Sequence, residues 1–197
     1  MSKLQEIRAD YDKDSIVIYQ AYNKAIALPA INNQKFMSPF SFNRMTWIKP
    51  SYLWLMERSQ WGLKSNQEHI LAVRITREFW DKALSLGVLT HPEKSIHGNA
   101  DNWQRDFENA LVHVQWDPER SIRGAKLTHS SIQVGISRHL IHEYNDSAII
   151  TIEDLTPLTR KIYDLKQQGK IDNAKKLLPK ERLYPVNADI AKRLGID

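Results

Sequence analysis

The sequence predicts one α+β domain: a mixed or antiparallel sheet of about five strands, flanking helices and a basic C-terminal helical arm. Three observations lead to this class. Strand-like and helix-like segments follow one another without a regular alternation. No glycine-rich turn of the Rossmann or P-loop kind follows a strand. The length of 197 residues suits a single domain, which we expect at residues 1–185 with a tail at 186–197.

Five short segments rich in β-branched and aromatic residues predict the strands. In the segment SIQVGIS, Gln133 and Gly135 share a polar face, which either receives a ligand or is an ordinary half-exposed strand face. Asp117 is expected to end its strand in a turn, because the residue before a proline is held in extended geometry. The predicted strands cover residues 15–22, 69–76, 111–117, 130–136 and 147–153.

Prolines mark the limits of several predicted helices. Pro50 suits the first position of a helix that runs to about Gln60. Thr156 is expected as the N-cap of another helix, with Pro157 at its first position. A short helix after residue 22 is expected to be interrupted by Pro29, since proline has no N–H to donate. Further helices are predicted at 77–86, 103–110, 138–144 and 171–178.

Composition narrows the class of protein. Hydrophobic residues make up 42% and charged residues 26% of the chain, which is typical of globular proteins and not of disordered ones. The absence of cysteine excludes a disulfide scaffold, cysteine-bound zinc and thiol catalysis. No apolar run is long enough to span a bilayer, and the first residues lack the apolar stretch of a secretory signal. We therefore expect a cytoplasmic protein without membrane contact.

The basic excess lies in the C-terminal part of the chain. The formal net charge is +5. Residues 1–154 hold 18 basic and 18 acidic side chains, whereas residues 155–197 hold 10 basic and 5 acidic ones. Because basic surfaces attract polyanions, any binding of RNA or DNA is assigned to the C-terminal part. The alternative is a basic helix face that is only solvated.

Several stretches resemble one known family. The most specific are RMTWIKPSY at 44–52 and WDPER at 116–120. With these stretches the chain resembles, over about residues 8–185, the family catalogued as domain of unknown function 4291. The family label implies a single domain and names no activity. The other matching stretches are VIYQAY at 17–22, SIQVGIS at 131–137 and IEDLTP at 152–157.

A shorter resemblance concerns activity. The tripeptide Tyr19–Gln20–Ala21 is similar to the strand that opens the core of many ADP-ribosyltransferases. In those enzymes an arginine or histidine at the position of Gln20 holds the ribose or phosphate of NAD, and a glutamate near a later strand orients the nicotinamide ribose. The resemblance implies NAD as the cofactor, contacts with its ribose side for Tyr19 and Gln20, and the role of the glutamate for Glu153.

The segment before the helix at residue 50 has the composition of a phosphate site. The glutamine at position 20 is uncharged, so a basic side chain must pair with the phosphate: Arg8, Arg44 or Lys49. A helix N-terminus adds free N–H groups, and Trp47 or Tyr52 offers a face for stacking. The alternative is that the tryptophans at 47, 54 and 61 form an apolar stripe of the core.

Carboxylates near strand ends are candidate acids and bases. Asp117 and Glu119 would project from a strand end beside Arg120, and could act as a pair if their pKa values differ. The alternative is an acid–arginine pair that only locks the turn. Glu153 is the preferred catalytic carboxylate, because Asp154 suits the capping of the next helix.

Two functions of different classes follow from these patterns. One is a non-catalytic nucleic-acid-binding module that stacks bases on tryptophans and uses the basic arm. The other is an ADP-ribosyltransferase-like enzyme that takes NAD and modifies a nucleotide or nucleic acid. No metal site is expected, since the histidines at 139 and 142 have no evident third ligand. The enzyme hypothesis assigns catalysis to Glu153 and Gln20 and cofactor binding to Tyr19, Arg44, Trp47, Lys49, Tyr52 and Gln133.

Overall fold

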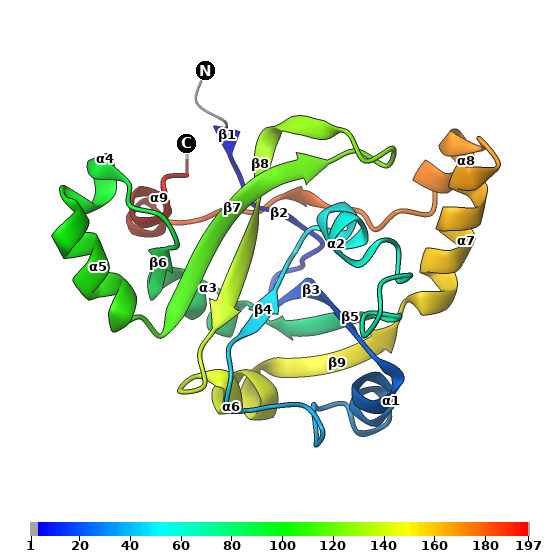
Figure 1. The fold of residues 1–197 in the computed structure, drawn as a ribbon, viewed down its shortest axis with the longest axis horizontal. Helices are drawn as coiled ribbons and strands as arrows, with labels where there is room; N and C mark the ends of the chain where they lie inside the picture. The colour runs from blue at the N-terminus through cyan, green and yellow to red at the C-terminus, as the bar shows by residue number, and fades with distance from the viewer. Residues whose placement is uncertain (1–3, 197) are drawn as a thin grey trace.

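A computed structural model describes residues 4–196 (Figure 1). Within that range no helix is long and apolar enough to cross a membrane. The strands are β1 (Leu4–Gln5), β2 (Arg8–Ala9), β3 (Ser15–Tyr22), β4 (Thr46–Ile48), β5 (His69–Thr76), β6 (Gly87–Leu89), β7 (Val112–Arg120), β8 (Lys126–Ile136), β9 (Ile149–Asp154) and β10 (Arg182–Leu183). The helices are α1 (Lys24–Asn33), α2 (Tyr52–Ser59), α3 (Arg77–Ser85), α4 (Lys94–His97), α5 (Ala100–Glu108), α6 (Ile141–Glu143), a π-helical turn (Tyr144–Ala148), α7 (Thr156–Gln167), α8 (Ile171–Lys175) and α9 (Ala188–Leu194).

Two sheets carry the fold, which confirms the predicted α+β class. The larger sheet has the strand order β1-β8-β7-β6, and β4 also pairs with β8. The smaller sheet is antiparallel and has the order β3-β5-β9. The backbone N–H of Tyr19 in β3 donates to the carbonyl oxygen of Lys49 at 2.7 Å. This bond joins the smaller sheet to the end of β4 and brings the polar residues of both strands together.

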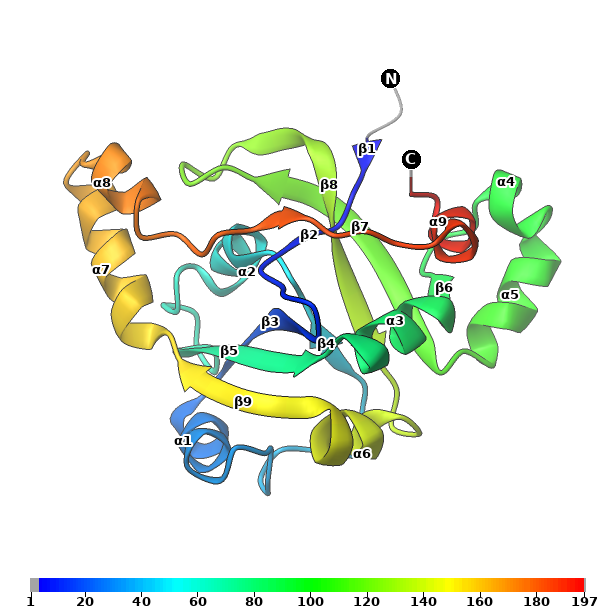
Figure 2. The ribbon, with the colours of Figure 1, turned by 180° about the vertical axis from the view of Figure 1, so that it is seen from behind.

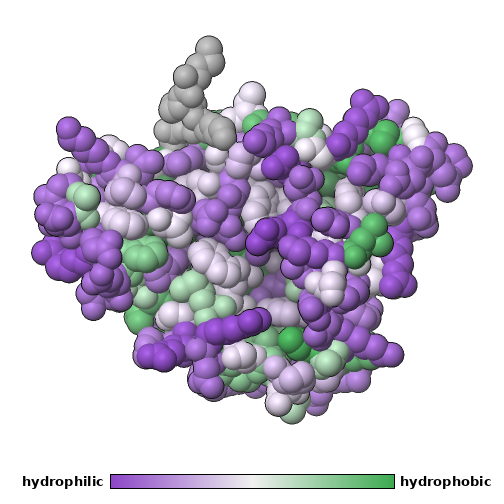
Figure 3. Space-filling model, in the orientation of Figure 1, coloured by the Kyte–Doolittle hydropathy of each residue, from purple (hydrophilic) through white to green (hydrophobic). Residues whose placement is uncertain are grey.

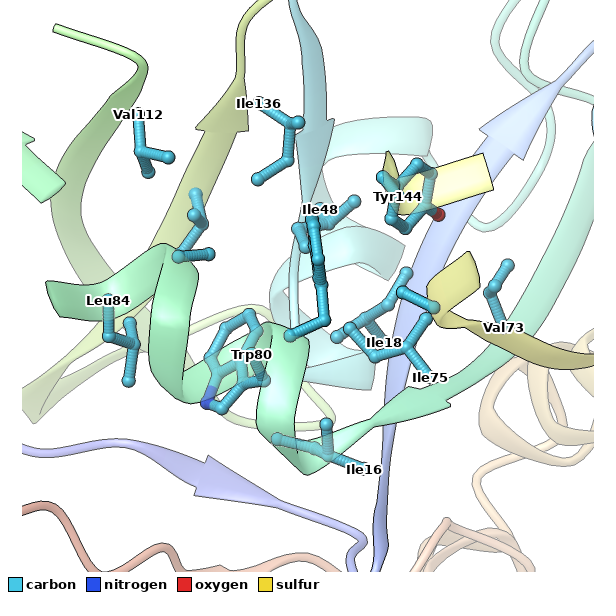
Figure 4. Close-up of a cluster of buried hydrophobic side chains, with 14 of the residues drawn as sticks. Ile16, Ile18, Ile48, Val73, Ile75, Trp80, Leu84, Val112, Ile136 and Tyr144 are labelled. Atoms are coloured by element: carbon cyan, nitrogen blue, oxygen red, sulfur yellow. The ribbon is translucent and has the colours of Figure 1, made fainter. Parts of the chain in front are cut away.

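The main core fills the space between the two sheets and α3 (Figure 4). Ile16 and Ile18 of β3 meet Trp80 of α3 there, and all three are fully buried. The intervening Val17 and Tyr19 point to the other face of β3 and enter a second cluster that includes residues of α7. Because β3 is covered on both faces, its sequence is almost continuously apolar.

Strands β3 and β5 have the predicted bounds, whereas most helices differ from the prediction at one or both ends, and α1 and α2 show why. Pro29 does not interrupt α1, which continues to Asn33. Buried Ala27 and Ala30 pack this helix on the core, and this packing offsets the hydrogen bond that proline cannot make. The N-cap of α2 is Ser51, whose Oγ accepts the N–H of Trp54 at 3.1 Å, so α2 begins after Pro50 and not at it.

The prediction of a turn at Asp117 is wrong. Strand β7 continues to Arg120, and the chain reverses at residues 121–125, where Gly124 has φ +85°. Pro118 is accommodated because the pairing of β7 with β8 is irregular directly after it: Pro118 pairs with Ser130, and Arg120 pairs with Lys126. The side chain of Asp117 is therefore held in the middle of a sheet and not at a loop.

The chain after residue 179 is not a free arm. Strand β10 pairs with β2, and α9 packs through Ile190 and Leu194 into the main core. Figure 2 shows this segment crossing the back of the molecule beside β2. The two apolar residues are four positions apart on one helix face, a spacing that is easily overlooked in a short, basic segment.

Candidate functional site

A polar cleft of about 640 Å³ opens where β3, β4 and α2 meet the hairpin of β7 and β8. Its volume is within the range of small-molecule sites. Hydrophilic side chains surround a hollow near the middle of the face shown in Figure 3. The lining residues are Gln20, Ala21, Tyr22, Phe40, Ser41, Arg44, Met45, Thr46, Trp47, Lys49, Trp54, Leu55, Arg58, Gln67, Gln115, Asp117 and Gln133.

Helix α2 contributes Trp54, Leu55 and Arg58 to the lining of the cleft. Trp54 and Arg58 are four residues apart and lie on one face of the helix. Glu181 fixes the start of α2 by accepting the N–H of Tyr52 at 2.7 Å. Burial raises the pKa of Glu181 to about 8. The C-terminal segment thus supports the cleft from behind through a residue that the sequence did not single out.

Three basic side chains line the cleft. Lys49 is only 8% exposed, and its Nζ lies 5.1 Å from the centre of the Trp54 ring. Burial and the nearby Arg58 lower the pKa of Lys49 to about 8, while Asp117 acts in the opposite direction. Within residues 4–196 no salt bridge is formed by Lys49, Arg44 or Arg58. The cleft therefore holds positive charge that no carboxylate pairs with directly.

Asp117 is the carboxylate among the lining residues, and two amides fix its orientation. Gln115 Nε2 donates to Oδ1 at 3.0 Å, and Gln133 Nε2 donates to Oδ2 at 2.7 Å. Gln115 and Gln133 are direct partners across β7 and β8, so the sheet itself sets this arrangement. Neutral donors orient a carboxylate without cancelling its charge, which leaves Asp117 able to stabilise a positive centre.

A buried hydrogen-bond network forms the floor of the cleft. Gln20 is 2% exposed, and its Nε2 donates to Tyr22 Oη at 2.8 Å and to Thr46 Oγ1 at 2.9 Å. Tyr144 Oη donates to Gln20 Oε1 at 2.6 Å. The amide of Gln20 is therefore hydrogen-bonded to protein groups. The groups at the floor that a ligand can contact are the hydroxyls of Tyr22 and Thr46.

The surface above Gly135 is occupied by side chains. A Cβ at Gly135 would lie 2.5 Å from Met45 Sδ and 3.0 Å from the Trp47 ring, which is paired with it across β4 and β8. The expected approach of a ligand to this glycine is thus replaced by an approach of Trp47. The glycine lets the indole of Trp47 approach the sheet closely at the wall of the cleft.

Two aromatic residues that were expected to bind cofactor belong to the second core cluster. Tyr19 is 1% exposed and points away from the cleft, because alternate residues of β3 face opposite sides. Tyr52 is equally buried, and its hydroxyl lies 2.8 Å from Thr159 Oγ1. Neither residue lines the cleft. Trp47 and Trp54 do, and because Lys49 lies over the Trp54 ring, Trp47 is the indole considered for stacking.

Glu153, the preferred catalytic carboxylate, does not join the cleft. It lies on β9 beside a separate cavity of about 150 Å³, which Tyr19 and Arg74 also line. The reason is strand pairing: β9 adds to β5 at the edge of the smaller sheet, away from β4. Asp154 accepts the N–H of Thr156 at 2.9 Å and so stabilises the start of α7, as expected. The prediction of Thr156 as the N-cap is wrong: the N-cap is Leu155, and the Thr156 hydroxyl accepts the N–H of Ile70 instead.

Three other candidates have structural partners outside the cleft. Arg8 pairs with Glu6 at 3.2 Å. Arg120 pairs with Glu57 at 3.5 Å, and its backbone N–H donates to the buried carboxylate of Glu119 at 2.7 Å. The acid–arginine pair expected within the WDPER segment is not formed within the described residues, because Arg120 pairs with Glu57 of α2 instead. Asp117 of the same segment reaches the cleft.

Comparison with known families decides what the chain is related to. Residues 6–184 match the family described as Domain of unknown function (DUF4291). The chain belongs to this family. The match includes every residue that lines the cleft, so the cleft lies within the DUF4291 domain. No curated protein matches the sequence.

Several cleft residues of this DUF4291 domain were missed from the sequence, although two of them carry a signal. Arg58 follows Trp54 by one helical turn, and Gln115 precedes Asp117 by two residues on the same strand face. Tyr22, which also lines the cleft, and Tyr144, which lies behind it, have the sequence context of core residues. Within residues 4–196 no group of three or more histidine, aspartate or glutamate residues has the arrangement of a metal site.

Proposed function

We propose that the cleft binds a nucleotide-type anion, with its phosphates among Arg44, Lys49 and Arg58. The observation that carries this proposal is that three basic side chains line one cleft and none of them forms a salt bridge within the described residues. Positive charge in a concave, partly dry site attracts phosphate strongly. The exposed part of Trp47 offers a face for a base or a nicotinamide ring.

The chemistry that we propose is transfer of an ADP-ribosyl group from NAD. The bond between the ribose C1′ and the nicotinamide nitrogen breaks, and its electron pair leaves with nicotinamide. An acceptor nucleophile then forms the new bond to C1′ and releases a proton. Asp117 takes the role that the sequence assigned to Glu153, because its oriented charge can stabilise the oxocarbenium-like transition state. Gln20 acts indirectly, by orienting the hydroxyls of Tyr22 and Thr46.

Calorimetric titration with NAD and with ADP-ribose tests the binding step. Lys49→Met is the informative variant, because it keeps the buried stem and removes only the charge. A charge-assisted contact with phosphate predicts about 10- to 100-fold weaker binding. Lys175→Ala on α8, an exposed position outside the cleft, is the control and retains the wild-type affinity. Lack of NAD binding by the wild type, or equal affinity in Lys49→Met, overturns the proposal.

A second function is favoured by the surface of α7 and α8. Exposed basic side chains there far outnumber the acidic Asp164 and Asp172. A single-stranded RNA is the probe, and its affinity is expected to fall steeply with salt and on charge reversal of Lys175 and Lys176. If the affinity for RNA changes neither with salt nor on charge reversal, this surface is excluded as the RNA-binding site. Stacking by Trp61 is not part of this proposal, since Lys166 lies over its ring at 5.2 Å. The basic residues are Arg160, Lys161, Lys166, Lys170, Lys175, Lys176 and Lys180.

A further inference from the structure

The hydrogen bonds at the floor of the cleft have a fixed direction from donor to acceptor, and the hydroxyl of Tyr144 determines that direction. The hydroxyl of Tyr144 is fully buried, and within residues 4–196 its hydrogen-bond partner is Gln20 Oε1 at 2.6 Å. Figure 4 shows this hydroxyl turned toward β3. A buried O–H needs an acceptor, and among the described residues Gln20 is the group that can supply one, so the amide oxygen of Gln20 faces Tyr144 and Tyr144 donates. The amide nitrogen of Gln20 is thereby turned to the opposite side.

The amide nitrogen of Gln20 makes its two short contacts with the hydroxyls at the floor, and its contact with the carbonyl oxygen of Trp47 is longer, at 3.5 Å. Tyr22 Oη and Thr46 Oγ1 both accept from Nε2, at 2.8 and 2.9 Å. These hydroxyl oxygens are 3.2 Å apart, so one of them donates to the other. Each hydroxyl carries a single proton, and one of the two protons is used between them. One O–H remains, and the cleft is the space that both hydroxyls line.

We propose that this remaining hydroxyl proton is a recognition element: the ligand that fills the floor supplies a hydrogen-bond acceptor, a carbonyl or phosphoryl oxygen. A buried O–H left without an acceptor is costly, so a ligand that lacks one is disfavoured. The inference rests on the proposed binding of a nucleotide-type anion and specifies how such a ligand docks. Tyr144 is a positioning residue, since it acts through Gln20 and does not line the cleft.

The ionisation of Tyr22 is consistent with this role. Burial raises its pKa to about 12, although the hydrogen bond with Thr46 and the charge of Arg44 act in the opposite direction. Tyr144 is also buried, and its pKa is raised well above the ordinary value. Both phenols therefore keep their protons at neutral pH, and the direction of donation does not change between pH 6 and 9.

The number of hydroxyl protons at the floor predicts that substitutions of Tyr22 and Thr46 have non-additive effects on NAD affinity. Tyr22→Phe leaves Thr46 to accept from Gln20 and frees its proton for the cleft. Thr46→Val likewise frees the proton of Tyr22. Each single variant keeps one donor, so we expect NAD affinity to fall by about threefold or less in each. The double variant has no donor, and we expect a loss of about tenfold or more beyond the product of the single losses.

Tyr144→Phe tests the positioning role from outside the cleft. Without the buried hydroxyl, the Gln20 amide can turn over and accept the protons of both Tyr22 and Thr46. The floor then offers no donor, and we expect about tenfold weaker NAD binding although no cleft residue has changed. Thermal unfolding of each variant separates loss of folding from loss of recognition, and variants that melt cooperatively are compared by calorimetry.

A measurement on the free protein needs no ligand. The side-chain amide of Gln20 gives two NMR signals, and both protons are hydrogen-bonded in the wild type. Tyr144→Phe is expected to shift or broaden both signals, whereas Lys175→Ala leaves them unchanged. Unaltered Gln20 signals in Tyr144→Phe overturn the inference whatever the ligand.

The outcomes distinguish the two proposals. If the wild type binds no NAD, the proposed function fails. If NAD binds but the single losses multiply to the double loss, or Tyr144→Phe binds as the wild type does, the inference about the floor fails and the proposed function stands. Non-additive losses together with weaker binding by Tyr144→Phe support both.

Discussion

Strand β3 separates two cavities that both hold a carboxylate beside an arginine. On one side lies the cleft, with Asp117 and Arg58; on the other side lies the smaller cavity, with Glu153 and Arg74. Asp117 is fixed by two amide donors, whereas Glu153 is exposed and forms no side-chain hydrogen bond within the described residues. Arg74 is already paired with Asp12 at 3.3 Å. The two sides contain similar residue types. They differ in how many hydrogen bonds hold the carboxylate and in how many basic side chains have no salt-bridge partner among the described residues.

This difference indicates where chemistry is possible. A transition state is stabilised by groups that already have the required orientation, because reorganisation during the reaction costs free energy. The cleft has such a group in Asp117, together with the basic residues that could bind a phosphate. The cavity near Glu153 is smaller, at about 150 Å³, and its arginine has another partner. We therefore expect function to follow the cleft.

The largest effect that we predict is on the reaction rate when Asp117 is replaced by its amide. Asp117→Asn removes the charge and keeps the shape, and we expect the release of nicotinamide from NAD to slow by about 10²- to 10³-fold. Glu153→Gln is the matched change on the other side of β3, and we expect the wild-type rate. Nicotinamide is quantified by chromatography over time. If Glu153→Gln stops the reaction and Asp117→Asn does not, the conclusion that the chemistry takes place in the cleft is wrong.

The pH dependence of binding sharpens the comparison through Lys49. Its pKa of about 8 means that the ammonium form prevails below pH 8 and is lost above it. A bound phosphate prefers the ammonium form, so affinity for ADP-ribose is constant below pH 8 and falls above it, by up to tenfold per pH unit. Lys49→Arg keeps its charge throughout this range, and we expect a flat profile in calorimetry. A decline of equal steepness in Lys49→Arg would show that another group titrates.

The sequence predicted more of the cleft than of its chemistry. Arg44, Lys49 and Gln133 were selected from local patterns and Gln20 from a family resemblance, and the structure brings all four to one cleft. Local patterns sufficed because strand alternation and the start of a helix fix which way a nearby side chain points. The partner strand of β9 is a non-local property, and it removes Glu153 from the cleft.

The same limit applies to the polar floor and to the C-terminal segment. Tyr144 is 124 residues away from Gln20 in the sequence, so no spacing rule could join them. Pro118 indicated a turn by its usual preference, but the pairing of β7 with β8 overrides that preference and keeps Asp117 within the sheet. Leu194 was read as part of a basic arm, although its burial in the core is decided by contacts with distant strands.

The smallest effect that we predict concerns the wall of the cleft. Gly135→Ala places a methyl group 2.5 Å from Met45 Sδ and 3.0 Å from the Trp47 ring, so both side chains must shift. Overpacking of this kind lowers the free energy of unfolding by about 1–3 kcal/mol, as measured by denaturant titration.

Met45 is flexible, and the double variant Gly135→Ala/Met45→Ala is expected to recover part of the stability. Because Trp47 remains crowded in that double variant, NAD affinity stays below the wild-type value. Full recovery of both quantities would show that the Trp47 indole is no part of the binding wall.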